Sequence, residues 1–251
     1  MKLSNEITDY LTGEKFDAGL SIPIAHAEND IISRFSFLIN ICQGKNVVHL
    51  GCCDHVPLIN EKIKNGVWLH RLLMDTCSRV MGVDINDKGI QFLKEELNIP
   101  SVYCSNILTD DLPETLPDSS WDYLVMGEIL EHIDNPVEFM SQIRKRHLGK
   151  IKQVIITVPN AFAIANYNGV LEQKEIINTD HRYWFTPFTL SKILTIAGYK
   201  IDSFYYAQEV SAKIGWRAKL KIFPYIQRKM NYQRLVKYPA FRDTLVMIAT
   251  L

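Results

Sequence analysis

The most informative stretch of the chain is residues 121–136, which read WDYLVMGEILEHIDNP. Residues 122–126 are an apolar run that predicts a buried strand, and the polar residues Glu128, Glu131 and His132 follow it directly. Helical sequence then extends over about 135–147. A strand that is apolar throughout, rather than alternating, is typical of a sheet covered on both faces.

The same order of strand and helix recurs on both sides of this stretch. Further strands are predicted over residues 47–50, 79–85, 102–104, 153–158, 199–206 and 243–250. Helices are predicted over residues 57–76, with a break at Asn65-Gly66, and over residues 87–97 and 189–197. Such alternation predicts a parallel sheet with right-handed crossover connections.

Length and composition fit one large folded unit with an extension. The chain has 251 residues, of which 47% are hydrophobic and 22% charged, as in ordinary globular proteins. We expect residues 1–45 to form a helical N-terminal extension, with an amphipathic helix near residues 28–41. Residues 46–251 would then form the main domain.

Charge is balanced overall but uneven locally. The 28 basic and 28 acidic residues give a net charge of zero, which argues against a dedicated nucleic-acid binder. Residues 207–237, within an insert at about 207–240, carry eight basic residues and one acidic residue, with interleaved aromatic residues. The positive charge of this insert predicts that it binds an anionic acceptor or makes a peripheral contact with a membrane. The alternative is a solvated pair of helices whose aromatic side chains pack on the core.

The cysteines suggest neither disulfides nor a metal site. Their number is five, two of them are adjacent, and no Cys-x-x-Cys occurs, so no metal is expected. The N-terminal residues have no apolar signal-peptide region, and no apolar run is long enough to span a membrane. The prediction is a cytoplasmic protein; the oligomeric state stays open.

Ligands of open parallel sheets bind at the carboxyl ends of the strands. Asp84 ends the strand predicted over residues 79–85, where its two acceptor oxygens suit the vicinal hydroxyls of a ribose. The alternative is that Asp84 only caps the helix beginning near Asp87.

Five motifs occur in order along residues 46–206. They are a glycine loop at Gly51, the acidic Asp84, the Gly-Glu-x-x-Glu-His of residues 127–132, Pro159-Asn160, and His181, Phe185 and Leu190 before Ala197-Gly198-Tyr199. Together they resemble the class I S-adenosylmethionine-dependent methyltransferases, most closely the small-molecule group that contains the ubiquinone-biosynthesis type. The resemblance implies a Rossmann-like α/β fold with a seven-stranded, mostly parallel sheet of order 3-2-1-4-5-7-6 and helices on both faces.

The resemblance also implies which residues bind the cofactor, S-adenosylmethionine. They are His49, Gly51, Cys52, Cys53, Asp84, Ile85, Asn106, Ile107, Gly127, Glu128 and His132. In this set, Asn106 would accept from the adenine amine, and Ile85 and Ile107 would cover the ring.

The glycine loop departs from the family pattern. His49 stands where the family has an acidic residue, and Cys53 and His55 replace two glycines. A residue other than glycine held at left-handed φ costs about 1–2 kcal/mol, so we expect the loop to take a different path. The departure leaves open a catalytically silent methyltransferase-like subunit. The other alternative, an NAD-dependent oxidoreductase, is disfavoured because Gly51, Cys53 and Val56 leave only one of the three glycines of its fingerprint.

The predicted reaction is methyl transfer to a hydroxyl or amine of a small metabolite, with a sugar or sugar phosphate of glycan biosynthesis as first choice. A hydroxyl acceptor needs a base, and a histidine titrates near neutrality, so His181 and His132 are the predicted catalytic residues. The predicted substrate-binding residues are His55, His70, Asn160, Arg182 and Tyr183.

Overall fold

The structure is a computed structural model, and it describes residues 7–24, 30–114, 120–208 and 222–251. Within these ranges, no helix is both long and apolar enough to cross a membrane.

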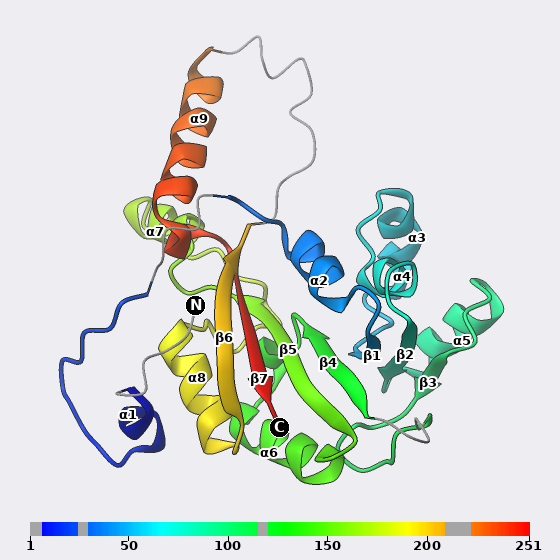
Figure 1. The fold of residues 1–251 in the computed structure, drawn as a ribbon. Helices are drawn as coiled ribbons and strands as arrows, with labels where there is room; N and C mark the ends of the chain where they lie inside the picture. The colour runs from blue at the N-terminus through cyan, green and yellow to red at the C-terminus, as the bar shows by residue number, and fades with distance from the viewer. Residues whose placement is uncertain (1–6, 25–29, 115–119, 209–221) are drawn as a thin grey trace.

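A seven-stranded sheet of order β3-β2-β1-β4-β5-β7-β6 forms the centre of the molecule (Figure 1). The strands are β1 (Asn46–Leu50), β2 (Arg79–Asp84), β3 (Val102–Cys104), β4 (Trp121–Gly127), β5 (Ile151–Pro159), β6 (Lys200–Ala207) and β7 (Thr244–Thr250). β1 to β5 are parallel, whereas β7 runs antiparallel to both β5 and β6. The predicted fold class and strand order are therefore confirmed.

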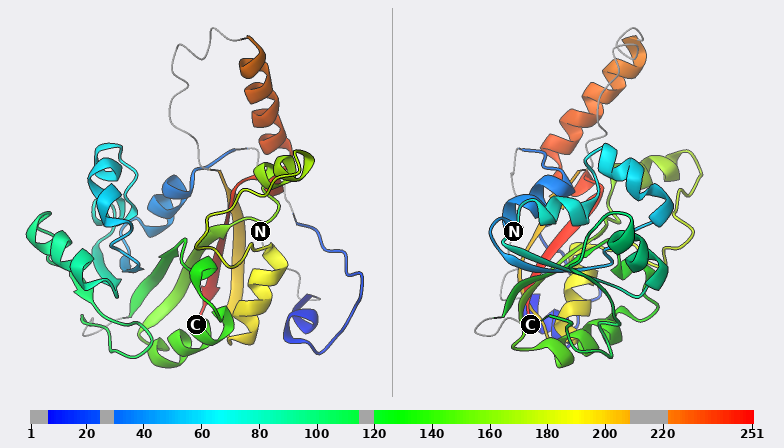
Figure 2. Two further views of the ribbon diagram at one scale, coloured as in Figure 1. Left: turned by 180° about the vertical axis from the view of Figure 1, so that it is seen from behind. Right: turned by 90° about the vertical axis from the view of Figure 1, so that its right-hand side faces the viewer.

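Helices cover both faces of the sheet (Figure 2). Val48, Leu124 and Ile156 point to one face, where they join the core cluster that includes residues of α6 (Pro136–His147) and α8 (Pro187–Ile196). Val47 and Val125 point to the other face and join the cluster that includes residues of α2 (Arg34–Cys42) and α4 (Leu69–Met74). Burial on both faces explains why apolar residues follow one another in these strands instead of alternating with polar ones.

The segment after β1 folds into two helices. They are α3 (Val56–Lys64) and α4, separated by residues 65–68, and Gly66 has a φ of +67°. The predicted break at Asn65-Gly66 is therefore confirmed. Helix α5 (Asp87–Glu95) begins after Asn86, whose side chain accepts from the Gly89 backbone N–H at 3.0 Å.

The N-terminal region is less helical than predicted. Helix α1 (Thr8–Thr12) is short and packs on α8. Helix α2 begins at Arg34, because the Ser33 side chain caps it by accepting from the Ser36 N–H at 3.0 Å. The helix predicted near residues 28–41 therefore starts later, and residues 25–29 lie outside the described ranges.

Two further helices lie between β5 and β7. Helix α7 (Ile164–Leu171) follows β5, and α9 (Ile222–Lys237) extends away from the sheet (Figure 1). The first half of the predicted basic insert, residues 209–221, lies outside the described residues. Short 3₁₀ helices at Leu130–His132 and Pro239–Phe241 complete the described elements.

Candidate active site

Two neighbouring cavities open at the carboxyl ends of β1, β2 and β4. The polar cavity, of about 670 Å³, includes Arg34, His55, Glu128 and His181 in its lining; the apolar cavity, of about 550 Å³, is lined by residues such as Phe139. Both cavities share the lining residues Gly51, Asp84, Ile129 and His132. Volumes of this size are typical of small-molecule sites, and the shared residues show that one extended ligand could occupy both cavities.

The loop after β1 forms the floor between the cavities. Gly51 has a φ of +76°, and a Cβ there would approach the Ile129 side chain to 2.9 Å, so glycine is required. The next left-handed residue is Asp54, with a φ of +50°, whereas His55 is extended at −85°. Asp tolerates this conformation better than most residues, so the loop takes the different path expected from the missing glycines.

Asp84 anchors this loop from the end of β2. Its Oδ2 accepts from the Cys53 backbone N–H at 3.0 Å, and its Oδ1 accepts from the Asn86 N–H at 2.9 Å. Asn86, rather than Asp84, caps α5, which removes the capping alternative. Each carboxylate oxygen has a second lone pair, and Asp84 lines both cavities.

A histidine pair lies beneath the loop. His49 Nδ1 and His70 Nδ1 are 3.1 Å apart, so one ring donates and the other accepts. Burial lowers the pKa of both rings, that of His70 to about 4, so the pair is neutral at ordinary pH. A Cβ on Gly82 would stand 2.8 Å from the His70 ring. His70 is fully buried and does not line the polar cavity in this structure, and its substrate contact stays a prediction.

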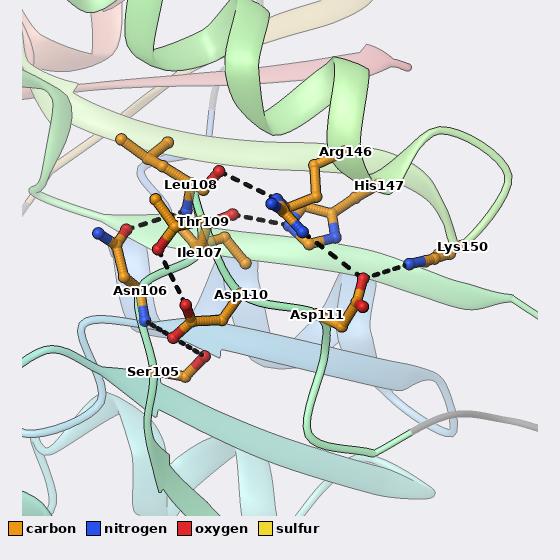
Figure 3. Close-up of polar contacts among 10 residues, drawn as sticks. All are labelled: Ser105, Asn106, Ile107, Leu108, Thr109, Asp110, Asp111, Arg146, His147 and Lys150. Atoms are coloured by element: carbon orange, nitrogen blue, oxygen red, sulfur yellow. Dashed lines mark hydrogen bonds and ion pairs between the residues drawn. The ribbon is translucent and has the colours of Figure 1, made fainter.

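Residues of the loop after β3 line the apolar cavity. Figure 3 shows the polar contacts of this loop. Asn106 Oδ1 accepts from the Leu108 N–H at 3.0 Å, and the Asn106 N–H donates to Asp110 Oδ2 at 2.8 Å. His147 Nε2 bonds to the Ile107 carbonyl at 2.8 Å, which ties the loop to α6. Asn106, Ile107 and the exposed Ile85 line the apolar cavity as an adenine pocket requires.

Glu128 follows β4 in a strained conformation. Its φ is +57°, which is unfavourable for a residue with a Cβ and is often found at functional sites. Its Oε1 accepts from the Thr157 hydroxyl at 3.1 Å and pairs with Arg34 Nη1 at 3.2 Å. These contacts fix a carboxylate and a guanidinium side by side in the polar cavity.

Glu131, His132 and His181 form a compact cluster at the rim of the polar cavity. The His132 and His181 rings lie edge to face with centroids 4.7 Å apart, and His181 Nε2 is 3.9 Å from Glu131 Oε1. The Glu131 side chain is fully buried, and its pKa is raised to about 8, first by burial and then by the neighbouring Glu128. The structure thus brings the two predicted catalytic histidines together.

Other predicted substrate residues have structural contacts instead. Asn160 is buried, and its side-chain N–H groups donate to the Ala240 and Arg242 carbonyls at 2.8 and 2.6 Å. Arg182 pairs with Asp134, and the Tyr183 hydroxyl donates to the Asp134 carbonyl at 2.7 Å. None of these three residues lines the polar cavity in this structure, and their role in substrate binding stays a prediction.

The cysteines of the loop after β1 contribute by packing and, at Cys53, by a backbone hydrogen bond. Cys52 and Cys53 are buried and do not line either cavity in this structure, and their role in cofactor binding stays a prediction. A Cβ on Gly89 would meet Cys53 Sγ at 2.8 Å, so the glycine in α5 makes room for the cysteine. The Cys53 backbone N–H holds Asp84.

Arg34 lines the polar cavity but is not among the residues predicted from the sequence. Its side chain is 15% exposed, and its buried Nε has no hydrogen-bond partner among the described residues. The available signal was a basic residue in the first turn of α2, where the helix dipole disfavours positive charge. Such a residue commonly serves another purpose, here a guanidinium turned toward the polar cavity.

Residues 65–148 match the family model described as a methyltransferase domain. Among curated proteins, none matches this sequence. The small RNA methyltransferase HEN1 is similar in fold, with a TM-score of 0.50 and 17% identity over 94% of this chain and 27% of that chain. A methyltransferase from Archaeoglobus fulgidus has a TM-score of 0.49 and 19% identity over 87% and 91% of the two chains. The magnesium protoporphyrin IX methyltransferase of Synechocystis PCC 6803, with bound S-adenosylhomocysteine, has values of 0.47 and 14%, over 86% and 79%.

The sheet has the strand order of the class I S-adenosylmethionine-dependent methyltransferases, and residues 65–148 match a methyltransferase domain. The residues present fit this cofactor, because Asp84 offers free lone pairs where the cavities meet and apolar side chains line one of the two. In the other cavity, Arg34 and Glu128 offer opposite charges that suit a zwitterionic amino-acid group.

Proposed function

We propose that this chain transfers a methyl group to a hydroxyl or amine of a small molecule bound in the polar cavity. The observation that carries the proposal is the pair of joined cavities, with Asp84 where they meet and the two candidate catalytic histidines at the rim. The Glu-x-x-Glu-His spacing of residues 128–132 supports placing the chain with the small-molecule group that contains the ubiquinone-biosynthesis type.

Residues of the two cavities would bind different parts of the cofactor. S-adenosylmethionine, when bound, supplies a methyl group already activated on a sulfonium sulfur. Asp84 would accept from the ribose hydroxyls, Ile85 and Ile107 would cover the adenine, and Arg34 would bind the methionine carboxylate. Alignment of this kind accounts for about 7–11 kcal/mol of a reaction barrier. The chain's main contribution is therefore position.

His132 and His181 face the acceptor. His132 Nδ1 bonds to the Asp180 carbonyl at 3.2 Å, which fixes the ring and leaves Nε2 as the acceptor nitrogen. Burial, first, and the neighbouring His132 lower the pKa of His181, which keeps that ring neutral near pH 7. A neutral imidazole can accept the proton that a hydroxyl loses as it is methylated.

The polar lining favours a sugar or a sugar phosphate as the acceptor. Histidine, carboxylate and amide groups line the cavity, and Lys62 lies at the same surface. The basic insert supports an anionic group on the acceptor, since residues 207–237 carry eight basic residues and one acidic residue. Contacts of this kind weaken as salt rises, because exposed charges are screened beyond about 8–10 Å.

The test is transfer of labelled methyl from S-adenosylmethionine to a panel of sugars, sugar phosphates, phenols, amines and a short RNA. We expect label in a hydroxyl-bearing small molecule, more with a phosphate than without, and less at physiological than at low salt. Label in the RNA alone would contradict the proposal. Cofactor binding without transfer to any acceptor would favour the silent subunit.

A further inference from the structure

The Glu131 carboxyl group is buried without a hydrogen-bond partner among the described residues. The residue has 0% exposed surface, and neither Oε1 nor Oε2 has a hydrogen-bond partner among the described residues. Leaving a buried carboxylate unpaired is costly, and buried charges are normally paired or bound to a metal ion. The nearby His181 Nε2 lies 3.9 Å from Glu131 Oε1, beyond hydrogen-bond distance.

The two histidines present nitrogen atoms toward the same point. Ligand atoms of Glu131, His132 and His181 all lie within 4.8 Å of one another. Zinc-type ions bind such atoms at about 2.0–2.2 Å, so side-chain movements of tenths of an ångström would bring all three onto one ion. His181 is 12% exposed and Glu131 is fully enclosed, so the cluster is sheltered from bulk water.

The surroundings also orient these side chains. The bond from His132 Nδ1 to the Asp180 carbonyl leaves Nε2 as the free ligand atom, which is the outer contact that metal-binding histidines usually make. The Arg182 backbone N–H donates to the Glu131 carbonyl at 2.8 Å and joins the loop of His181 to the turn of Glu131. The two segments are thus held together by bonds outside the cluster.

We propose that Glu131, His132 and His181 bind one divalent cation of the Mn²⁺, Fe²⁺, Co²⁺ and Zn²⁺ group. Two imidazoles and one carboxylate favour these ions over Mg²⁺ and Ca²⁺, which prefer oxygen ligands. Three protein ligands leave coordination positions open toward the polar cavity. A nitrogen that binds the ion cannot also accept a proton, so in the metal-bound protein the ion would polarise the acceptor hydroxyl in place of a histidine base, and solvent would take the proton. Only this role of the open positions rests on the proposed function.

A second candidate set, Cys52, Cys53 and Asp84, is less suited to an ion. Both Asp84 oxygens already accept from backbone N–H groups. The pKa of the Cys52 thiol is raised, first by its contact with Cys53 and then by burial, so the thiolate that a metal requires is disfavoured. This set provides the competing location in the experiment.

The experiment titrates the full chain, freed of metal by chelator and dialysis, with Co²⁺ alone. We expect one equivalent to bind, with visible absorption typical of nitrogen and oxygen ligands. Calorimetry should show tighter binding of Zn²⁺ and Mn²⁺ than of Mg²⁺. Affinity should rise with pH, because the ion displaces the proton held by Glu131. Neither cofactor nor acceptor is present, so the result is independent of whether the chain transfers methyl groups.

Single variants locate the ion. Glu131→Gln, His132→Ala and His181→Ala should each lower Co²⁺ affinity at least tenfold, with urea midpoints showing that each remains folded. His55→Ala, which removes an exposed histidine of the same cavity, should bind as the unaltered chain does. No Co²⁺ binding, equal binding by all the variants, or a thiolate-type absorption lost in Cys53→Ser would each overturn the proposal.

Discussion

Two clusters of buried polar side chains lie at the same edge of the sheet, and they differ in how far their hydrogen-bonding groups have partners. Beneath the loop after β1, His49 and His70 bond to each other, and Asp84 accepts from two backbone N–H groups. After β4, the Glu131 carboxylate has no hydrogen-bond partner among the described residues. The first cluster leaves one neutral nitrogen, His70 Nε2, without a hydrogen-bond partner among the described residues, whereas the second leaves both oxygens of a carboxyl group without one. A buried carboxyl group left in this way indicates where a ligand is needed.

The two clusters also respond to pH in opposite directions. Burial lowers the pKa values of the histidine pair, so the folded state binds fewer protons there than the unfolded state does. Burial raises the pKa of Glu131, so the folded state binds more. Acid therefore destabilises the first cluster and alkali the second, which allows the two to be separated experimentally.

The largest effect is expected from His181→Ala. Loss of a residue that removes a proton costs about 10²–10⁴-fold in rate, so turnover should fall within that range. Affinity for S-adenosylhomocysteine should change less than about twofold by calorimetry, since His181 lies on the acceptor side. The exposed His55 of the same cavity provides the control, His55→Ala, with a smaller loss. A fall in cofactor affinity with unchanged turnover would contradict the assignment.

The histidine pair should make the protein sensitive to acid. The folded pKa of His70, about 4, lies below its ordinary value of 6.5, so its stabilising contribution is complete above pH 6.5 and lost as pH falls toward 4. At about 1.4 kcal/mol per pH unit, the loss is about 3 kcal/mol. His70→Gln should flatten the dependence of the urea midpoint on pH in this window. An unchanged slope of the urea midpoint against pH in His70→Gln, or the same flattening in His55→Gln, would contradict the role of the histidine pair.

Glu131 should act in the opposite direction at higher pH. Its folded pKa of about 8 lies above its ordinary 4.5, so stability falls as pH rises from 4.5 through 8. Between pH 6.5 and 8 the folded histidine pair stays neutral and its contribution changes by less than about 1 kcal/mol, whereas the fall due to Glu131 is about 2 kcal/mol in metal-free protein. Glu131→Gln should remove the fall, whereas Glu96→Gln, on an exposed residue, should keep it. If stability depended on pH in the same way in both variants, this prediction would be wrong.

Asp84→Ala should give the smallest effect, on cofactor affinity. Loss of the ribose contact should weaken S-adenosylhomocysteine binding at least tenfold, about 1.4 kcal/mol. Asp87→Ala, at the exposed start of α5, is the matched control and should bind normally. Because Asp84 also holds the Cys53 N–H, its unfolding midpoint is measured alongside. Unchanged affinity by calorimetry would rule out the ribose role.

The fold could be predicted from the sequence because burial on both faces leaves a plain signal. Runs such as residues 122–126 and 153–158 are mostly apolar, and Gly127 and Pro159 mark their ends. The strand order followed from the resemblance, whereas the late start of α2 depended on the cap at Ser33.

The site could be predicted in part. Asp84 and Glu128 follow strands, so topology placed them at the cavity. Burial of His70 depends on the close approach to Gly82, and the contacts of Arg182 depend on Asp134, neither of which spacing reveals. The pairing of Glu131 with His181 joins distant loops, so a search for closely spaced ligands could not find it.

One measurement tests the central claim most directly, which is that the joined cavities bind S-adenosylmethionine. Thermal unfolding is compared with S-adenosylmethionine, S-adenosylhomocysteine and NAD side by side. A ligand at 100 times its dissociation constant stabilises the folded chain by about 2.7 kcal/mol. We expect both adenosyl ligands to raise the midpoint and NAD to leave it unchanged. A shift with NAD alone, or with none of the three, would contradict the account.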